Sequence, residues 1–183
     1  MCAIRSLIKN TGLLKASSTR AEVEEGGLFL PQHGPDHIET ATDPEAFADW
    51  PAGLYEEMIA NRDSGTVGSV LVSETDRVRV WHLSIPPGCR CPFHRHVNPY
   101  FWSCHTNGLS RNYFSDGQVR DAEHFAGQTK HFHYGPGDYM LHSVENIGET
   151  ELVFTTVEFL DGTNQPLNIP EEVRLAPPAV AAE

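Results

Sequence analysis

Apolar and polar residues alternate with a period of two along much of the chain. From Val67 onward, short apolar runs are separated by turn residues such as Pro86-Pro87-Gly88 and Gly135-Pro136-Gly137. A period of two is typical of half-buried strands, and many short runs at this spacing are typical of an all-β sandwich or barrel. The pattern predicts strands at 67–73, 77–85, 93–96, 99–107, 109–115, 118–125, 130–134, 138–142 and 151–160.

Two dipeptides between apolar runs predict tight hairpins. They are Asn107-Gly108 and Asp116-Gly117. Asn-Gly and Asp-Gly readily adopt the positive φ angles that two-residue hairpin turns require. We therefore expect the strands on either side of each dipeptide to pair with each other.

A different period precedes the strands. Apolar residues recur at helical spacing over 44–61, with Asp43 at the N-cap position and Pro44 in the first turn. Pro51 and Gly53 could split this helix in two. We expect it to pack on the outside of the main domain, the alternative being a lid over a pocket.

The chain is expected to have three parts. Residues 1–66 form an N-terminal extension that contains the helix, and residues 67–160 form the barrel. Residues 161–183 are a tail rich in Pro and Ala that either wraps the surface or is disordered.

Length and charge exclude several classes of function. The 183 residues fit one domain, and 13 Lys and Arg stand against 25 Asp and Glu, a formal net charge of −12. Nucleic acids and anionic membrane surfaces are bound mainly through Lys and Arg, so neither is an expected partner. No stretch approaches the roughly 20 apolar residues that a membrane span requires.

The N-terminus and the cysteines bear on the compartment. Residues 1–20 contain four basic residues and no acid, which resembles a transit peptide, although a frayed basic end of a cytoplasmic protein is favoured over an organellar one. Without a secretory signal, Cys2, Cys89, Cys91 and Cys104 are expected as reduced thiols. The C-x-C-x2-H pattern ending at His94 is too closely spaced for an ordinary zinc site.

Histidine is unusually abundant, and this changes the picture from a plain barrel to a candidate metal protein. Eight of the ten histidines lie between His82 and His142. His94 and His96 are two residues apart on a predicted strand, so they point to the same side and could grip one ion. The best candidate for a third ligand is in the stretch 142–146, directly before the last predicted strand.

Two motifs in this region resemble those of the cupin superfamily. Gly88, His94 and His96 form G-x5-H-x-H, and Gly108 follows His96 after eleven intervening residues. His142 and Asn146 form H-x3-N, which is similar to the end of the second cupin motif. The resemblance covers roughly residues 67–160. It implies a small jelly-roll barrel with a divalent metal inside, held by His94, His96 and His142.

The chain departs from the cupin pattern in two places. Phe101, with Tyr100 beside it, stands where a Glu usually supplies a fourth ligand, and Gly137 and Tyr139 replace the Pro and Gly of the second motif. Three neutral imidazoles leave the full charge on a divalent ion, which favours an anionic organic ligand. This pattern is similar to that of the three-histidine cupin dioxygenases, which implies Fe(II), although Zn, Ni or Co would also suit three His ligands.

Strand alternation suggests the pocket residues. If Phe101 replaces the Glu, then Phe101, Ser103 and His105 should line the interior, and Tyr100 with its alternating neighbours should lie on the other face. His105 is a candidate for acid–base catalysis or for a hydrogen-bonded core position, and Tyr100 is a second candidate for proton transfer.

Other polar residues have weaker claims on the pocket. Arg111 could bind a substrate carboxylate, although a salt bridge on the barrel exterior is the more ordinary role. His131 and His133 form a second H-x-H that could replace or add to the triad, and a half-exposed strand face is favoured for them.

The favoured function is a mononuclear Fe(II) dioxygenase acting on a small organic acid, diketone or thiol. The alternatives are a non-redox lyase, isomerase or hydrolase, and a cupin that binds a small molecule without turnover. The resemblance also makes a homodimer the expected assembly.

Overall fold

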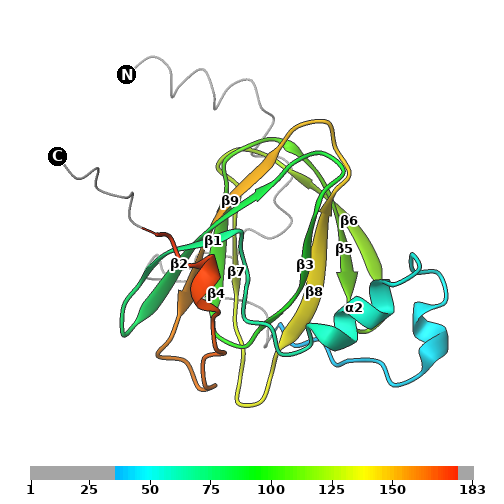
Figure 1. The fold of residues 1–183 in the computed structure, drawn as a ribbon, viewed down its shortest axis with the longest axis horizontal. Helices are drawn as coiled ribbons and strands as arrows, with labels where there is room; N and C mark the ends of the chain where they lie inside the picture. Colours follow the sequence, from blue (N-terminus) through cyan, green and yellow to red (C-terminus); the bar gives the residue numbers. More distant parts are fainter. Residues whose placement is uncertain (1–35, 177–183) are drawn as a thin grey trace, which may run out of the picture. The chain divides into compact units, whose positions relative to one another are not determined.

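Nine strands form two antiparallel sheets that face each other in the computed structural model, which describes residues 36–176 (Figure 1). The sheets have the orders β1-β2-β9-β4-β7 and β3-β8-β5-β6. The strands are β1 (Val70–Glu74), β2 (Val78–Ile85), β3 (Arg90–His96), β4 (Tyr100–Cys104), β5 (Gly108–Phe114), β6 (Val119–His124), β7 (Thr129–Phe132), β8 (Met140–Asn146) and β9 (Leu152–Phe159).

The strand pairing is that of a jelly roll. β2 pairs with β9, β3 with β8, β4 with β7 and β5 with β6, so the chain runs as one long hairpin wound into a barrel. The prediction of an all-β jelly-roll barrel is confirmed. The predicted strands all occur, and the largest shift is in β8, which was expected at 138–142.

Only one of the two predicted hairpins forms. Asp116-Gly117 joins β5 to β6, and Gly117 has the positive φ of 87° that this turn requires. The Asn107-Gly108 prediction was wrong, because β4 and β5 belong to different sheets. Gly108 has no positive φ, but a Cβ there would lie 2.8 Å from Leu152 Cδ2. A glycine is therefore suited to this corner by close packing and not by turn geometry.

The expected helix is divided as its Pro51 and Gly53 allow. A 3₁₀ turn, η1 (Pro44–Phe47), precedes α2 (Leu54–Ala60), and Gly53 begins α2 with a φ of 84°. Asp43 caps η1 by accepting a hydrogen bond from the Glu45 amide. Both elements bury apolar side chains on the outer face of the sheet that contains β3, β8 and β5 (Figure 1). This cluster contains Phe47, Trp50, Leu54, Met58, Phe93, Tyr113 and Leu141.

The described part of the tail lies along the other sheet. Ile169 and Val173 pack against the buried cluster of Val67, Leu71 and Trp81, and Arg174 forms a parallel bridge with Leu71. The turn η2 (Glu171–Val173) carries Val173. The basic segment 1–20 lies outside the described residues. Across 36–176, no helix combines the length and apolarity needed to cross a bilayer.

Asn146 ties the end of β8 to its surroundings. Its fully buried amide donates to the carbonyls of Ile85 and Thr150, at 2.7 and 2.8 Å, and its Oδ1 accepts from the Gly148 amide at 2.9 Å. The Asn of the H-x3-N motif therefore closes the loop after β8 and joins it to β2.

Replacing this side chain should destabilise the barrel. Asn146→Ala leaves buried backbone groups without partners, so the free energy of unfolding should fall by about 2–4 kcal/mol in urea denaturation. Asn168→Ala is the control, because Asn168 is exposed and its side chain makes no hydrogen bond to a residue within 36–176. Equal stability of the two variants would contradict the assigned role.

Candidate metal centre

Strand register brings three histidines together inside the barrel. His94 on β3 is directly opposite His142 on β8, and His96 lies two residues further along the same face of β3. All three are buried, and each offers a ring nitrogen within 4.8 Å of the others. The three residues that the sequence nominated as ligands thus form one cluster. Over residues 36–176 the cluster contains no carboxylate and no cysteine.

The imidazole nitrogens are poised to accept a metal. His94 Nδ1 donates to the Pro92 carbonyl at 2.8 Å, which leaves Nε2 with a free lone pair. His96 Nδ1 and both nitrogens of His142 have no hydrogen-bond partner within the described part of the chain. Buried polar atoms without partners are costly. A divalent metal would bind one nitrogen of each ring and so remove part of this cost, which means that the residues present fit such an ion.

Burial also keeps these rings in the form that binds metals. It lowers the pKa of His94 to about 4, although the hydrogen bond to Pro92 opposes the shift. It lowers the pKa values of His96 and His142 well below the usual range, and the neighbouring histidines add to the effect. All three imidazoles are therefore neutral at pH 7, as metal ligation requires.

Two aromatic rings hold the imidazoles in place. Tyr100 stacks on His96, with ring centroids 4.1 Å apart and planes 13° from parallel. Phe114 stacks on His142 at 5.6 Å and 14°. These contacts restrict ring rotation, so the donor atoms are oriented before any ligand binds.

A cavity of about 300 Å³ opens beside the histidines. Its wall is mostly aromatic and aliphatic, with a few polar groups from β5, β6 and β7. The lining residues are Val67, Leu83, His94, His96, Tyr100, Trp102, Asn112, Phe114, Arg120, Asp121, Ala122, His124, Lys130, Phe132, Met140, His142, Val144, Phe154 and Thr156.

The prediction for β4 selected the wrong face. Phe101, Ser103 and His105 do not line the cavity, whereas Tyr100 and Trp102 do. His105 is exposed, and its Nε2 forms a hydrogen bond with Thr155 Oγ1 at 2.8 Å on the outer face of the sheet. The family spacing counted back from Gly108 places the strand one residue out of phase, and such a slip moves every side chain to the opposite face. Tyr100, and not Phe101, therefore faces the histidines.

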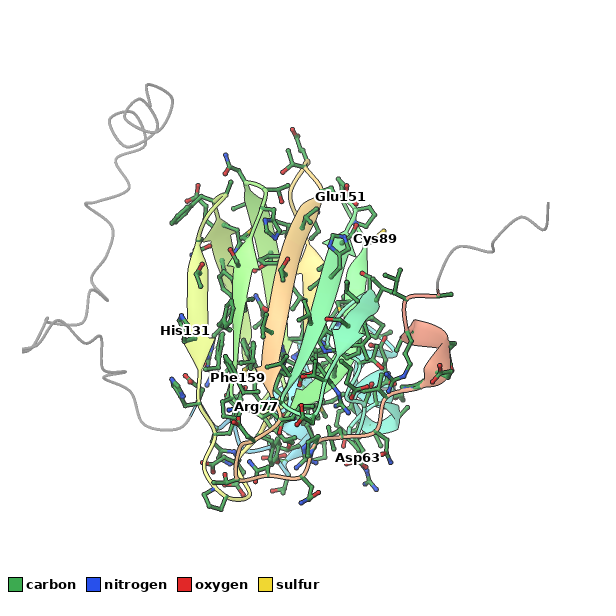
Figure 2. All side chains as sticks on the ribbon, turned by 90° about the vertical axis from the view of Figure 1, so that its left-hand side faces the viewer. Asp63, Arg77, Cys89, His131, Glu151 and Phe159 are labelled. Carbon is green, nitrogen blue, oxygen red and sulfur yellow. The ribbon has the colours of Figure 1, made fainter. Side chains whose placement is uncertain are left out.

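Three other candidates also lie outside the cavity. Arg111 forms a two-pronged ion pair with Asp121, both contacts at 2.8 Å, on the outer side of its sheet, so a substrate-binding role is wrong and the salt-bridge alternative holds. His131 and His133 are exposed. Figure 2, which faces the outer side of the β1-β2-β9-β4-β7 sheet, shows His131 on its edge strand.

His124 is a pocket residue that the sequence did not identify. Its Nδ1 donates to Gln128 at 3.1 Å, and Ser110 Oγ lies 2.8 Å from its Nε2. Its ring also packs edge-on against Trp102 and Phe154. His124 belongs to no motif. The alternation of β6 would have placed it in the cavity only if the pairing register of β6 with β5 had been known.

Glu158 is a buried carboxyl on β9. Trp81 Nε1 donates to its Oε2 at 2.7 Å, and its backbone is paired with Tyr100 and Arg79. Burial raises its pKa to about 7, although the bond from Trp81 and the charge of Arg79 oppose the shift. The barrel interior thus holds this group partly protonated near neutral pH.

This shift gives stability a defined pH dependence. The folded chain holds the proton up to about pH 7, whereas the unfolded chain releases it near 4.5. The free energy of unfolding should therefore fall as the pH rises between these values. Glu158→Gln should remove this slope, a relative gain of up to about 3 kcal/mol at pH 8 in urea denaturation. The exposed Glu56→Gln is the control, and an unchanged slope in Glu158→Gln would refute the assignment.

Comparisons with known proteins find similar solved structures but no matching family. No family model and no curated protein sequence matches the chain. A cupin domain from Bordetella pertussis is 26% identical over 48% of this chain and 85% of that one, with a TM-score of 0.42. An RmlC-like cupin with a double-stranded β-helix fold from Methanocaldococcus jannaschii is 18% identical over 54% and 84%, with a TM-score of 0.41.

A third similarity is to part of a larger enzyme. Bacillus subtilis oxalate decarboxylase, a protein with Mn(II) centres, is 26% identical over 45% of this chain and 21% of its own, with a TM-score of 0.36. These likenesses are loose, and the fold assignment depends on the strand pairing itself. That pairing is the pairing of a jelly roll, and its three buried histidines form a cluster that could hold a metal ion.

Proposed function

We propose that this chain is a mononuclear metal enzyme, with Fe(II) the favoured ion, that acts as a dioxygenase on a small organic acid, diketone or thiol. His94, His96 and His142 would hold the ion. The observation that carries the proposal is a cavity of about 300 Å³ bordered by three neutral imidazoles with no carboxylate among them.

The donor set supports a site that is open to substrate. Three protein ligands leave further positions free, as in catalytic centres, whereas a structural site is closed by a fourth ligand. When bound, Fe(II) would supply a redox centre with room for substrate and O₂. The aromatic wall formed by Trp102, Phe114 and Phe132 would keep water away from the bound substrate.

Tyr100 has a role of its own in this proposal. Burial raises the pKa of its phenol well above the usual value, so the hydroxyl keeps its proton at neutral pH. The ring is stacked on His96, so substrate bound beside the histidines would lie near it. Tyr100 would therefore donate a hydrogen bond to a substrate oxygen.

The same tyrosine favours a second candidate, a non-redox lyase, isomerase or hydrolase. There the metal would act as a Lewis acid and Tyr100 would move a proton. The homodimer stays a prediction, which the mass measured by light scattering would check.

Metal content tests the ligand assignment. The chain purified without added metal should contain about one divalent ion per chain, and the His94→Ala, His96→Ala double variant should lose it, because one remaining imidazole cannot hold the ion. Elemental analysis by mass spectrometry measures the metal content per chain. The matched control is His131→Ala, His133→Ala, which alters the exposed H-x-H at the end of β7 and should keep the metal.

A double variant that folds by circular dichroism and retains the parental metal content would make the ligand assignment wrong.

Oxygen uptake separates the two activities. Protein loaded with Fe(II) should consume O₂ with at least one member of a panel of small carboxylates, β-diketones and thiols, because substrate and O₂ both need the open positions. An oxygen electrode and product analysis give the measurement. Turnover that persists anaerobically in Zn-loaded protein would select the non-redox candidate instead.

A further inference from the structure

Lys130 differs from every other cation within residues 36–176. The eight arginines there each lie within 4.0 Å of a carboxylate. Lys130, the one lysine of this region, has no such partner in it. In a chain with almost twice as many acidic as basic residues, a cation without a carboxylate stands out.

The position of Lys130 points to the cavity. It lies on β7 on the same side as Phe132, and its Nζ is 4.7 Å from the centre of that ring. Both side chains line the cavity beside the histidines. Alternation puts Lys130 on the face of β7 that buries Phe132, opposite to Thr129 and His131, and its own side chain also reaches solvent at the rim of the cavity.

A second cation faces it from the other sheet. Arg120 on β6 lines the same cavity, and its guanidinium lies 4.6 Å from the centre of the Phe114 ring. β6 and β7 are the edge strands of the two sheets, so the two cations stand on either side of the gap between the sheets. Arg120 is only partly neutralised, since its nearest carboxylate, Asp116, is 3.7 Å away.

The charge of Lys130 also acts on the cavity wall. Burial is the main cause of the lowered pKa of His124, and the positive charge of Lys130 adds to this shift. The one carboxylate residue in the cavity lining, Asp121, is held by Arg111 on the outer side. The cavity is therefore cationic although the chain carries −12.

We propose that Lys130, assisted by Arg120, binds the carboxylate of a small organic acid whose apolar body fills the cavity and whose reacting end faces His94, His96 and His142. This inference rests on the proposed function for the reacting end, but the anion site itself does not need the metal. It selects the organic acid from the substrate classes considered above.

The chemistry of the wall specifies the ligand further. One ammonium without a carboxylate partner and one partly paired guanidinium match a monoanion better than a phosphate dianion. The aromatic and aliphatic lining favours a benzene ring or a branched alkyl chain over a sugar or a polar chain. Cations stacked over Phe132 and Phe114 keep their charge while shielding these rings from water.

Matched ligand pairs test the proposal on the full chain. Calorimetry would measure binding of benzoate against benzamide, and of 3-methylbutanoate against its amide, to metal-loaded and to chelator-treated protein. Each acid should bind more tightly than its amide in both forms. Lys130→Met, which keeps the length of the side chain, should weaken acid binding about tenfold and leave amide binding unchanged.

Two variants control for structure. Lys130→Arg keeps the charge and should bind the acids within a few-fold of the parent, whereas His131→Gln alters the neighbouring outward position and should change nothing. Arg120→Gln should weaken acid binding less than Lys130→Met does, because Asp116 already shares its charge.

Several results would overturn the proposal. They are an unchanged benzoate affinity in Lys130→Met, an equal loss for acid and amide, and no saturable binding of either acid to the parent chain. Inorganic phosphate binding more tightly than both acids would also refute the carboxylate assignment. Lys130→Met is expected to keep the metal. The histidine variants therefore test the proposed function, and the Lys130 variants test the anion site. Either proposal can fail while the other stands.

Discussion

The antiparallel register between β3 and β8 is the constraint on which the site depends. It sets His94 opposite His142, and the irregularity between Cys91 and His94 adjusts the phase of β3 so that both histidines of the H-x-H point inward. A slip of one residue would turn a histidine to the outer sheet surface, among the apolar side chains that cover it. Asn146 fixes the end of β8, so the register is anchored at the point where the strand leaves the barrel.

Electrostatics in the interior runs opposite to that of the whole molecule. The chain has an excess of acids, and each of the eight arginines within residues 36–176 lies within 4.0 Å of a carboxylate. Inside, the three histidines are neutral, Glu158 is partly protonated near pH 7 and two cations border the opening. An anion that reaches the cavity therefore moves from a negative surface potential to a positive local potential. The cavity can select anions although the net charge of the chain is negative.

The sequence was sufficient for the fold class and for the pair His94 and His96, because both depend on short-range spacing, whereas His142 was found through the resemblance to the second cupin motif. Period-two alternation marks strands, and H-x-H puts two side chains on one face whatever their partner strands are. The inward face of β4 and the role of Lys130 depend on which strands pair and in what phase, and no single strand encodes that. The Asn107-Gly108 prediction was wrong for a similar reason. The same dipeptide can occur in a tight hairpin or at a corner between two sheets. The two cases differ in the strand that β5 pairs with, which here is β8 and not β4.

The nested order of the strands has a consequence for folding. The hairpin of β5 and β6 is local, whereas β3 and β8 are separated along the chain by the four strands β4 to β7. Contacts between distant segments form late, because the entropy of closing the intervening chain must first be offset. The three histidines therefore come together only as the barrel closes. An ion that needs all three histidines would bind the folded barrel and not a partly folded form. Its binding would therefore stabilise the product of the last folding step.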